Sequence, residues 1–323
     1  SCPISCLRII HGQLFCGTDM GFMSTWRPQA SPLQDFEPPL DQCFVQADNL
    51  LLTASHHGGK ITRWHTDGSE QELAGPDYEG EPLGLDSVLL FEDGIVLSIL
   101  PQNRLVLWHA ISNDIISDVV ADVEITQSDD IHMLDKYRIC VLMEDSRLAV
   151  IDCTNGKPVA EHSGHSQSVN AVKQLKSGRV MSFGWDNSIQ LWQDEKYPEI
   201  LALQGHECAV MDAIELADGS LLSVSNDTRV KRWNSETGEL LETVQAEEVE
   251  QENAAGLGAC AELENGLIAI STFDRRILFY DRSWQLKSTV KLHSDISCLH
   301  AVGENKLVIG LKNGRLVMLS LGG

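Results

Sequence analysis

Short apolar strands separated by polar turns recur along the whole chain. In segments such as "ILPQNRLVLW", "STFDRRILFY" and "GLKNGRLVML" an apolar run leads into a tight polar turn and then into alternating apolar and polar positions. Such alternation is typical of β-strands with one buried face, whereas almost no segment keeps a helical period for more than a turn or two. The pattern predicts an all-β protein built from antiparallel hairpins.

The ends of these hairpins fall at regular intervals. Consecutive ends are separated by 38, 44, 43, 41, 41, 47 and 39 residues, which is the period expected of four-stranded propeller blades. Further apolar stretches before and after each hairpin, such as "VMDAIELADG" and "LLETVQ", complete four strands per unit. The eight strand ends are Trp26, Trp64, Trp108, Ile151, Trp192, Trp233, Tyr280 and Leu319.

A four-stranded sheet with two apolar faces cannot bury both of them alone, so such sheets stack around an axis and close into a ring. We therefore expect a single β-propeller domain over residues 1–323, with eight blades and with seven as the alternative. The last blade is expected to lack its outer strand, which leaves open how the ring closes. The proline-rich stretch 28–40 is interpreted as an irregular loop, and the first residue, Ser1, fits excision from a longer chain.

Two segments carry a fuller pattern than the rest. In "GHSQSVNAVKQLKSGRVMSFGWDNSIQLW" (164–192) and "GHECAVMDAIELADGSLLSVSNDTRVKRW" (205–233), a Gly-His pair stands 27 residues, counted from the histidine, before a tryptophan. These segments resemble the WD40 repeats of β-propellers. In that family a His, a Ser or Thr, an Asp and a Trp form a hydrogen-bonded set that fixes the strands and turns of a blade. The resemblance implies this structural network for His165, Ser182, Asp186 and Trp192, and for His206, Ser223, Asp227 and Trp233.

The other repeats depart from the WD40 pattern. The third keeps Ser98 and Trp108 but has Gln102 at the aspartate position, and the seventh keeps Asp274 but ends in Tyr280. No tryptophan of the chain is followed by aspartate. The regular spacing, more than any single repeat, therefore indicates the propeller.

Charge and cysteine usage narrow the partners and the compartment. The formal charge is 24 − 47 = −23, which repels phosphate backbones and favours a basic or neutral partner, so we expect no nucleic-acid binding. No stretch approaches the roughly 18 apolar residues of a membrane span. Nine scattered cysteines without a CxxC pair indicate buried thiols in a reducing compartment, and we expect a cytoplasmic protein. The oligomeric state stays open.

The sequence favours a protein without catalytic activity. A His, Ser and Asp set that occurs twice at a 41-residue offset is unlike a hydrolase triad, which is needed once. The chain has no GxSxG, HExxH or phosphate-binding glycine loop, and histidine pairs such as those in "SHHGGK" (55–60) lack zinc-motif spacing. We predict no cofactor and no metal. The alternative is a small-molecule sensor or hydrolytic enzyme that uses the central channel.

One turn position per repeat supplies the candidate binding residues. It lies seven residues before each strand end, and the resemblance implies that it faces the channel rim on the face most often used for binding. Trp185 and Phe273 stand there, and large exposed aromatics are enriched at binding hot spots, although both rings could instead fold over neighbouring loops. We predict an interaction scaffold that binds a protein or peptide. Its expected partner-binding residues are Trp185, Phe273, His57, Lys312, Asn226 and Glu144. The acidic stretch 245–258 is interpreted as a solvated surface.

Overall fold

The structure is a computed structural model of the 323-residue chain. Before residue 95 it describes the backbone of the strands alone. From there it describes residues 95–193 and 200–321, with gaps at 101, 110–111, 126–130, 136, 144–146, 247–255, 303–304 and 313–315. Within these ranges the side chains at 132, 133, 135, 302 and 316 are not described.

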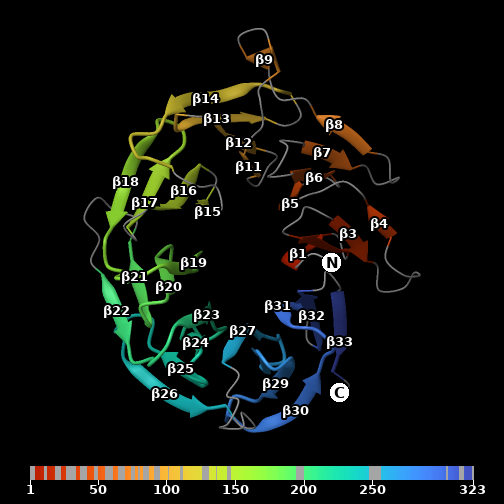
Figure 1. Cartoon of the computed structure of the whole chain (residues 1–323), viewed down its shortest axis with the longest axis vertical. Coiled ribbons are helices and arrows are strands. Elements are labelled where there is room, and N and C mark those ends of the chain that lie inside the picture. The colour runs from red at the N-terminus through yellow and green to blue at the C-terminus, as the bar shows by residue number, and fades with distance from the viewer. Residues whose placement is uncertain are drawn as a thin grey trace. The chain divides into compact units, whose positions relative to one another are not determined.

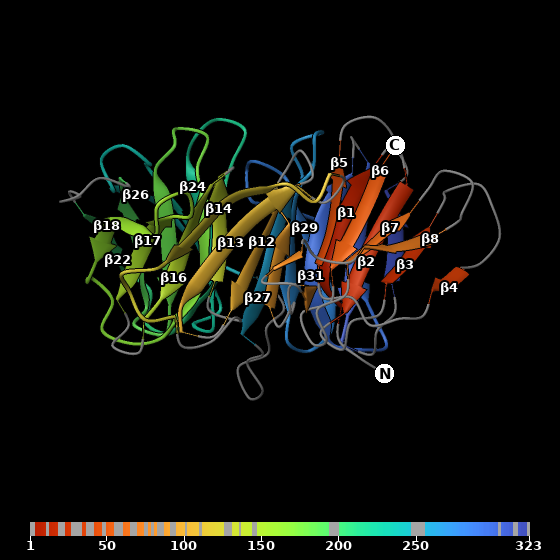
Figure 2. The ribbon, with the colours of Figure 1, turned by 90° about the horizontal axis from the view of Figure 1, so that it is seen from above.

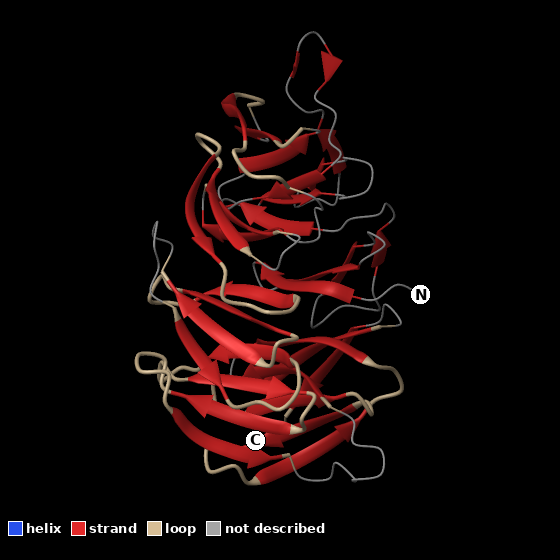
Figure 3. Cartoon of the chain, turned by 60° about the vertical axis from the view of Figure 1, so that its left-hand side comes forward, coloured by secondary structure: helices blue, strands red, loops and turns tan. Residues whose placement is uncertain are grey.

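The described part of the chain is all-β. Its regular elements are strands joined by turns and loops (Figure 3). Among the described residues there is no helix with the length and apolar character that a membrane crossing needs. The chain divides into two compact units, residues 4–162 and 163–323, and each unit is described by itself.

The described strands of the first unit form four sheets of four strands and one two-stranded pair (Figure 1). In each four-stranded sheet the strands pair in sequence order. The strands of the first two sheets are β1 (Ile4–Ile10), β2 (Gln13–Thr18), β3 (Met23–Trp26), β4 (Gln34–Phe36), β5 (Gln42–Gln46), β6 (Leu50–Ala54), β7 (Ile61–Trp64) and β8 (Glu70–Leu73). The pair and the next two sheets comprise β9 (Asp77–Tyr78), β10 (Glu81–Pro82), β11 (Ser87–Leu90), β12 (Ile95–Leu100), β13 (Arg104–His109), β14 (Ile115–Val120), β15 (Ile131–Asp135), β16 (Arg138–Leu142), β17 (Leu148–Asp152) and β18 (Lys157–His162).

The second unit continues the same pattern with three four-stranded sheets and a last sheet of three described strands. Figure 2 shows the strands of a sheet running side by side, as the pairing requires. The strands are β19 (Val169–Gln174), β20 (Val180–Gly184), β21 (Ser188–Trp192), β22 (Leu201–Gln204), β23 (Val210–Glu215), β24 (Leu221–Ser225), β25 (Arg229–Trp233), β26 (Leu240–Gln245), β27 (Leu257–Glu262), β28 (Ile268–Thr272), β29 (Arg276–Tyr280), β30 (Leu286–Lys291), β31 (Ile296–Val302), β32 (Lys306–Leu311) and β33 (Leu316–Ser320).

The same register shift in strand pairing recurs from sheet to sheet in the second unit. In every sheet of the second unit the pairing of the first two strands shifts near the start of the first strand. A bulge re-aims the side chains that follow it, and bulges recur where a strand has a specific task. The shifts lie between Val169 and Ala171, Val210 and Asp212, Leu257 and Cys260, and Ile296 and Cys298.

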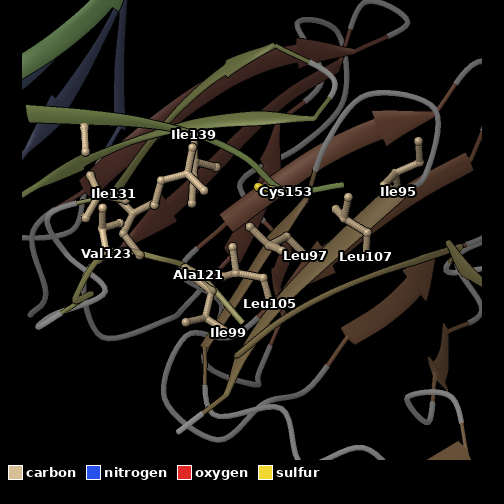
Figure 4. Close-up of a cluster of buried hydrophobic side chains, with 13 residues drawn as sticks. Ile95, Leu97, Ile99, Leu105, Leu107, Ala121, Val123, Ile131, Ile139 and Cys153 are labelled. Atoms are coloured by element: carbon tan, nitrogen blue, oxygen red, sulfur yellow. The ribbon is translucent and has the colours of Figure 1, made fainter. Parts of the chain in front are cut away.

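Apolar side chains fill the space between consecutive sheets. Figure 4 shows such a cluster in the first unit, where Leu97 and Leu107 of the third sheet meet Ile139 and Cys153 of the fourth, all fully buried. In the second unit the predicted strand ends Trp192, Trp233 and Tyr280 are among the largest fully buried side chains. Burying a side chain of this size stabilises the fold by about 2–3 kcal/mol, so the stacking of sheets contributes to the stability of the unit.

Polar contacts also join one sheet of the second unit to the next. The Lys176 N–H, in the turn after β19, donates to a Glu215 carboxylate oxygen at the end of β23 over 2.8 Å. The Ala217 N–H, in the turn after β23, donates in the same way to Glu262 at the end of β27 over 2.7 Å. A glutamate at the end of the first strand therefore holds the turn of the preceding sheet.

The predicted all-β fold of four-stranded antiparallel sheets is confirmed, and the last sheet has three described strands, as expected. One interpretation was wrong: the stretch 28–40 is not wholly a loop, because β4 lies within it and pairs Phe36 with Met23. Its prolines flank the three paired residues and remove no donor from the pairing. The single domain and the count of eight blades stay predictions.

Candidate functional site

Two buried polar networks lie in the fifth and sixth sheets. In the fifth, Trp192 Nε1 donates to Ser182 Oγ over 3.3 Å, Ser182 Oγ lies 2.8 Å from His165 Nε2, and His165 Nδ1 lies 2.9 Å from Asp186 Oδ2. Because an ionised carboxylate only accepts, His165 carries its proton on Nδ1, so the Ser182 hydroxyl donates to Nε2. Every donor in the network therefore points from the tryptophan toward the aspartate.

The sixth sheet repeats the network with closer spacing at the tryptophan. Trp233 Nε1 donates to Ser223 Oγ over 2.9 Å, Ser223 Oγ lies 2.8 Å from His206 Nε2, and His206 Nδ1 lies 2.8 Å from Asp227 Oδ2. The eight residues that the WD40 resemblance assigned to structural networks thus form two separate sets of four, one in each sheet.

Each network ends by tying a loop to a turn. Asp186 Oδ2 also accepts the Ser166 N–H over 3.1 Å, and its Oδ1 accepts the Ser188 N–H over 3.1 Å. Asp227 accepts the N–H of Glu207 over 2.9 Å and the N–H of Arg229 over 2.9 Å. The loop before the first strand and the turn between the second and third strands are therefore fixed by one carboxylate.

The charge states suit a structural role. Burial lowers the pKa of His165. The charge of Asp186 and its hydrogen bond to the ring act in the opposite direction but do not outweigh burial. Burial alone would raise the pKa of Asp186, but the His165 charge and the N–H groups of Ser166 and Ser188 hold it below its ordinary value. At neutral pH the pair is thus a neutral imidazole beside an ionised carboxylate.

The serines of these networks are poor candidates for nucleophiles. Ser182 and Ser223 are both 0% exposed, and each hydroxyl oxygen accepts a hydrogen bond from a buried tryptophan. A substrate carbonyl would have to reach the serine oxygen within about 3 Å, which these tryptophans prevent.

Other sheets keep parts of the network. In the third sheet Trp108 Nε1 donates to Ser98 Oγ over 2.9 Å although the sheet has Gln102 at the aspartate position. In the seventh sheet the Asp274 carboxylate accepts from Thr272 Oγ1 and pairs with Arg276 over 2.8 Å. The degenerate repeats therefore keep side-chain hydrogen bonds at the corresponding positions, with fewer or different residues.

The turn residues predicted to bind a partner occupy equivalent positions in the second unit. Each donates its backbone N–H to a carbonyl just before the first strand of its own sheet, which places all of them at the same end of their sheets. The pairs are Trp185 with Ser168 (2.9 Å), Asn226 with Ala209 (3.1 Å), Phe273 with Gly256 (3.0 Å) and Lys312 with Asp295 (2.9 Å). We call Trp185, Asn226, Phe273 and Lys312 the turn surface. His57 and Glu144 lie outside the described residues.

The side chains of the turn surface differ in how they are held. Trp185 is 52% exposed, and within the described part of the chain no hydrogen bond or ring contact holds its indole. Phe273 is 46% exposed, and one edge of its ring lies over Gly258, where an added Cβ would be 3.3 Å from Phe273 Cε1. Asn226 is packed against Gly256, with its Oδ1 buried and unpaired among the described groups, while Lys312 is exposed.

The sequence interpretation did not find a contact that joins three sheets. Lys173 Nζ lies 2.6 Å from Asp212 Oδ1, and the Cys260 N–H donates to Asp212 Oδ2 over 3.0 Å. The available signal was a lysine in the strand "VNAVKQ" and an aspartate in the interior of the strand "VMDAIE". Burial raises the pKa of the Cys260 thiol well above its ordinary value, so this cysteine is unsuited to act as a nucleophile. Within the described ranges no three His, Cys, Asp or Glu side chains group as a metal site would require.

Comparison with known families agrees with this geometry. The model described as "WD domain, G-beta repeat" matches residues 156–193, which contain the first complete network. Residues 156–193 thus match the WD40 repeat family.

WD40 relatives are similar to this chain over a part of their length. Ribosome biogenesis protein YTM1 of Candida glabrata is 28% identical over 119 residues, covering 31% of this chain and 26% of the relative. Apoptotic protease-activating factor 1 of Rattus norvegicus is 33% identical over 100 residues, covering 30% of this chain and 8% of the relative. The matches thus span about a quarter or less of these relatives.

Solved structures are similar over nearly the whole chain. A computationally designed protein, Ika8, has a TM-score of 0.75 at 19% identity and covers 99% of this chain and 96% of its own. The C-terminal WD40 domain of Sif2 has a TM-score of 0.72 at 16% identity, covering 98% and 94%, and the WD40 β-propeller domain of Doa1 a TM-score of 0.57 at 17% identity, covering 100% and 94%. At these identities the likeness establishes the fold, which is that of WD40 β-propellers.

Proposed function

We propose that this WD40 protein is a non-catalytic scaffold that binds a protein or peptide segment on its turn surface. The observation that carries the proposal is the pair Trp185 and Phe273, each about half exposed at equivalent positions of one compact unit. Large aromatic side chains lose unfavourable contact with water when a partner covers them, and they dominate the binding energy of many interfaces.

The backbone on both sides of Trp185 is fixed by contacts within its sheet. Trp185 lies between Gly184, whose backbone packs against Val169, and Asp186, which is fixed by the buried network. A side chain presented on a fixed backbone costs less entropy to immobilise on binding than one on a mobile loop. The similarity to WD40 propeller proteins supports the same role, because these relatives suggest a protein-interaction scaffold.

The alternative, a sensor or hydrolase that uses the channel, has less support. Among the described residues, the serines of the two complete networks and Cys260 are buried, so these candidate nucleophiles have no access to a substrate. Among the described cysteines, Cys140, Cys153 and Cys260 are buried free thiols, whereas the free thiol of Cys208 is exposed. Unpaired cysteines support the proposal of a cytoplasmic location.

The proposal is tested by capture of partners from a lysate of the native host, followed by direct titration of the purified partner. The baits are the wild type, the Trp185→Ala, Phe273→Ala double variant and a Leu240→Ala, Leu241→Ala control. Leu240 and Leu241 are 41% and 44% exposed on the outer strand β26, away from the turn surface. We expect the wild type and the control to retain a protein that the double variant loses. Equal retention by all three baits would contradict the turn surface as the binding site.

A further inference from the structure

Three large apolar side chains are exposed at the outer strands of the fifth and sixth sheets. Ile200, which directly precedes β22, is 45% exposed, and Leu240 and Leu241 at the start of β26 are 41% and 44% exposed. β22 and β26 are the last strands of their sheets and are consecutive outer strands of the second unit (Figure 1). We call Ile200, Leu240 and Leu241 the outer patch. Apart from the turn surface, these are the large apolar side chains exposed in the described part of the second unit.

A contact between the two sheets brings the outer patch together. The turn between β25 and β26 packs on β22, because a Cβ added to Gly238 would lie 2.9 Å from Leu201 Cδ1. Ile200 is the chain neighbour of Leu201, and Leu240 follows Gly238 by two residues. The exposed side chains of the patch therefore flank this contact from both sheets.

The turn that precedes the two leucines is held by its own hydrogen bonds. The Gly238 N–H donates to the Asn234 carbonyl over 2.9 Å, and the Asn234 N–H donates to the Glu239 carbonyl over 2.9 Å. The side-chain oxygen of Asn234 also accepts the N–H of Glu236 over 2.8 Å and that of Thr237 over 3.0 Å. A partner therefore meets a backbone that is already ordered, which lowers the entropy lost on binding.

The two segments that carry the outer patch are acidic. Residues 193–204 contain three acidic residues and one lysine, and residues 234–245 contain three glutamates and no cation. Three further cations contact these segments, and one of them is shared with an aspartate of the sixth sheet. The contacts are Arg179 with Glu236 (2.7 Å), Lys231 with Thr243 (3.0 Å), and Arg232 with Glu242 (3.4 Å) and Asp218 (2.9 Å). With these groups included the balance is 4 − 7 = −3, so the contacting cations do not neutralise the segments.

This negative charge is available to a partner. Glu239 is exposed and forms no ion pair with a described cation. Residues 194–199, which lie outside the described ranges and lead into Ile200, carry a net charge of −2 and so add to the same sign. The formal charge of the whole chain, −23, acts in the same direction at a distance.

We propose that the outer patch binds a basic segment of a second partner protein, in which Lys or Arg side chains flank two or three large apolar side chains. The apolar side chains of the segment cover the outer patch and remove its area from water. Lys and Arg can lay their apolar stems along such a surface while their charged groups reach the surrounding carboxylates. The site is separate from the turn surface, because the turn before β26 and the turn that carries Asn226 lie at opposite ends of β25.

A displayed library of random 12-residue peptides provides the probe. The library is first depleted on the Ile200→Ala, Leu240→Ala, Leu241→Ala variant, which removes peptides that bind elsewhere, and is then panned on the wild-type chain. We expect the enriched peptides to combine Lys or Arg with aromatic or aliphatic residues. Their affinity, measured by fluorescence polarisation at 50 and 300 mM NaCl, should fall several-fold at the higher salt, because exposed charge contacts are screened.

Matched charge variants test the electrostatic part of the contact. Glu239→Lys is compared with Glu264→Lys, which changes an exposed glutamate in the turn between β27 and β28. That turn lies toward the last sheet, because Asn265 Nδ2 donates to Asn305 Oδ1 over 2.7 Å. We expect Glu239→Lys to weaken the enriched peptides about fivefold and Glu264→Lys to leave their affinity within about twofold. Both variants should unfold at the wild-type temperature, because neither glutamate has an ion pair with a described cation.

Each outcome decides one part of the proposal. Enriched peptides that are neutral or acidic, or that Glu239→Lys binds as tightly as the wild type, would overturn the basic partner. A depleted library without any enriched peptide would overturn the outer patch and leave the turn surface untouched. The enriched peptides should bind the Trp185→Ala, Phe273→Ala variant like the wild type, and loss of binding there would overturn the separate site. Should the triple variant melt below the wild type, the comparison of Glu239→Lys with Glu264→Lys decides instead.

Discussion

The backbone N–H of Cys260 donates to the carboxylate of Asp212 over 3.0 Å, so that a side chain of one blade satisfies an amide of the next. The other oxygen of Asp212 lies 2.6 Å from Lys173 Nζ in the preceding blade. Three consecutive blades of the second unit therefore meet at one carboxylate.

Replacing Asp212 by alanine should lower the free energy of unfolding by about 1–3 kcal/mol, because the Cys260 amide is buried and loses its acceptor. Lys173 keeps partial access to solvent and adds less. Urea unfolding at pH 7 measures the loss. The control is Asp295→Ala, which removes a half-exposed ion pair with Arg275 and should cost less than about 1 kcal/mol. Equal losses in the two variants would contradict a joining role for Asp212.

Substitutions of Asp186 and of its neighbour Trp185 should differ in their effect on stability. Asp186→Ala removes the acceptor of His165 Nδ1 and of two backbone amides, and should cost about 1–3 kcal/mol of stability. Trp185→Ala removes a half-exposed ring without described contacts and should change stability by less than about 0.5 kcal/mol. Calorimetric melting of both variants measures this difference. Comparable drops in melting temperature would show that Trp185 is structural too.

The buried networks make stability fall on acidification. The folded-state pKa of His165 lies below its ordinary 6.5, so the unfolded chain binds this proton more readily, and stability is lost as the pH falls below about 6.5. Asp186 and Asp227 also have lowered pKa values, so their contribution is present above about pH 4 and is lost as the pH falls further through their folded values.

This pH dependence is measured by urea unfolding of the wild type and His165→Gln between pH 7.5 and 5. The wild type should lose stability over this range through His165, and the variant should lack that part of the loss. The difference in unfolding free energy between the two proteins should therefore narrow toward pH 5. A constant difference would show that His165 is not held neutral in the fold.

Gly184 permits the close approach that presents Trp185. An added Cβ at residue 184 would lie 2.7 Å from the Cα of Val169, so Gly184→Ala forces the turn away from the loop. We expect a loss of about 2–3 kcal/mol. Gly178→Ala, where nothing lies within 4 Å but φ is +86°, should cost about 1 kcal/mol through backbone strain alone. Chemical denaturation of both variants compares the two effects, and a smaller loss for Gly184→Ala would contradict the packing argument.

The sequence predicts contacts well where both partners lie inside one repeat. His165, Ser182 and Asp186 stand at offsets that recur 41 residues later, so their shared pattern identifies them as a set. Strand ends such as Trp108 and Tyr280 are predictable for the same reason, because large apolar residues at a fixed period mark buried positions.

Contacts between repeats were not predictable from the same pattern. Lys173 and Asp212 are 39 residues apart and Asp212 and Cys260 are 48 apart, so no shared period relates them. A backbone bulge near the start of each first strand also shifts which side chains face the neighbouring blade.

The glutamates at the ends of β23 and β27 have a consequence for the duplication of repeats in this chain. The acceptor for the turn of one blade is encoded in the following repeat, because Lys176 meets Glu215 and Ala217 meets Glu262. A tandem duplication of residues 205–245 would carry both halves of this contact: the new Glu215 would accept the amide of the first Ala217, and the new Ala217 would reach Glu262. Lengthening the protein by one repeat therefore requires no compensating substitution at this contact.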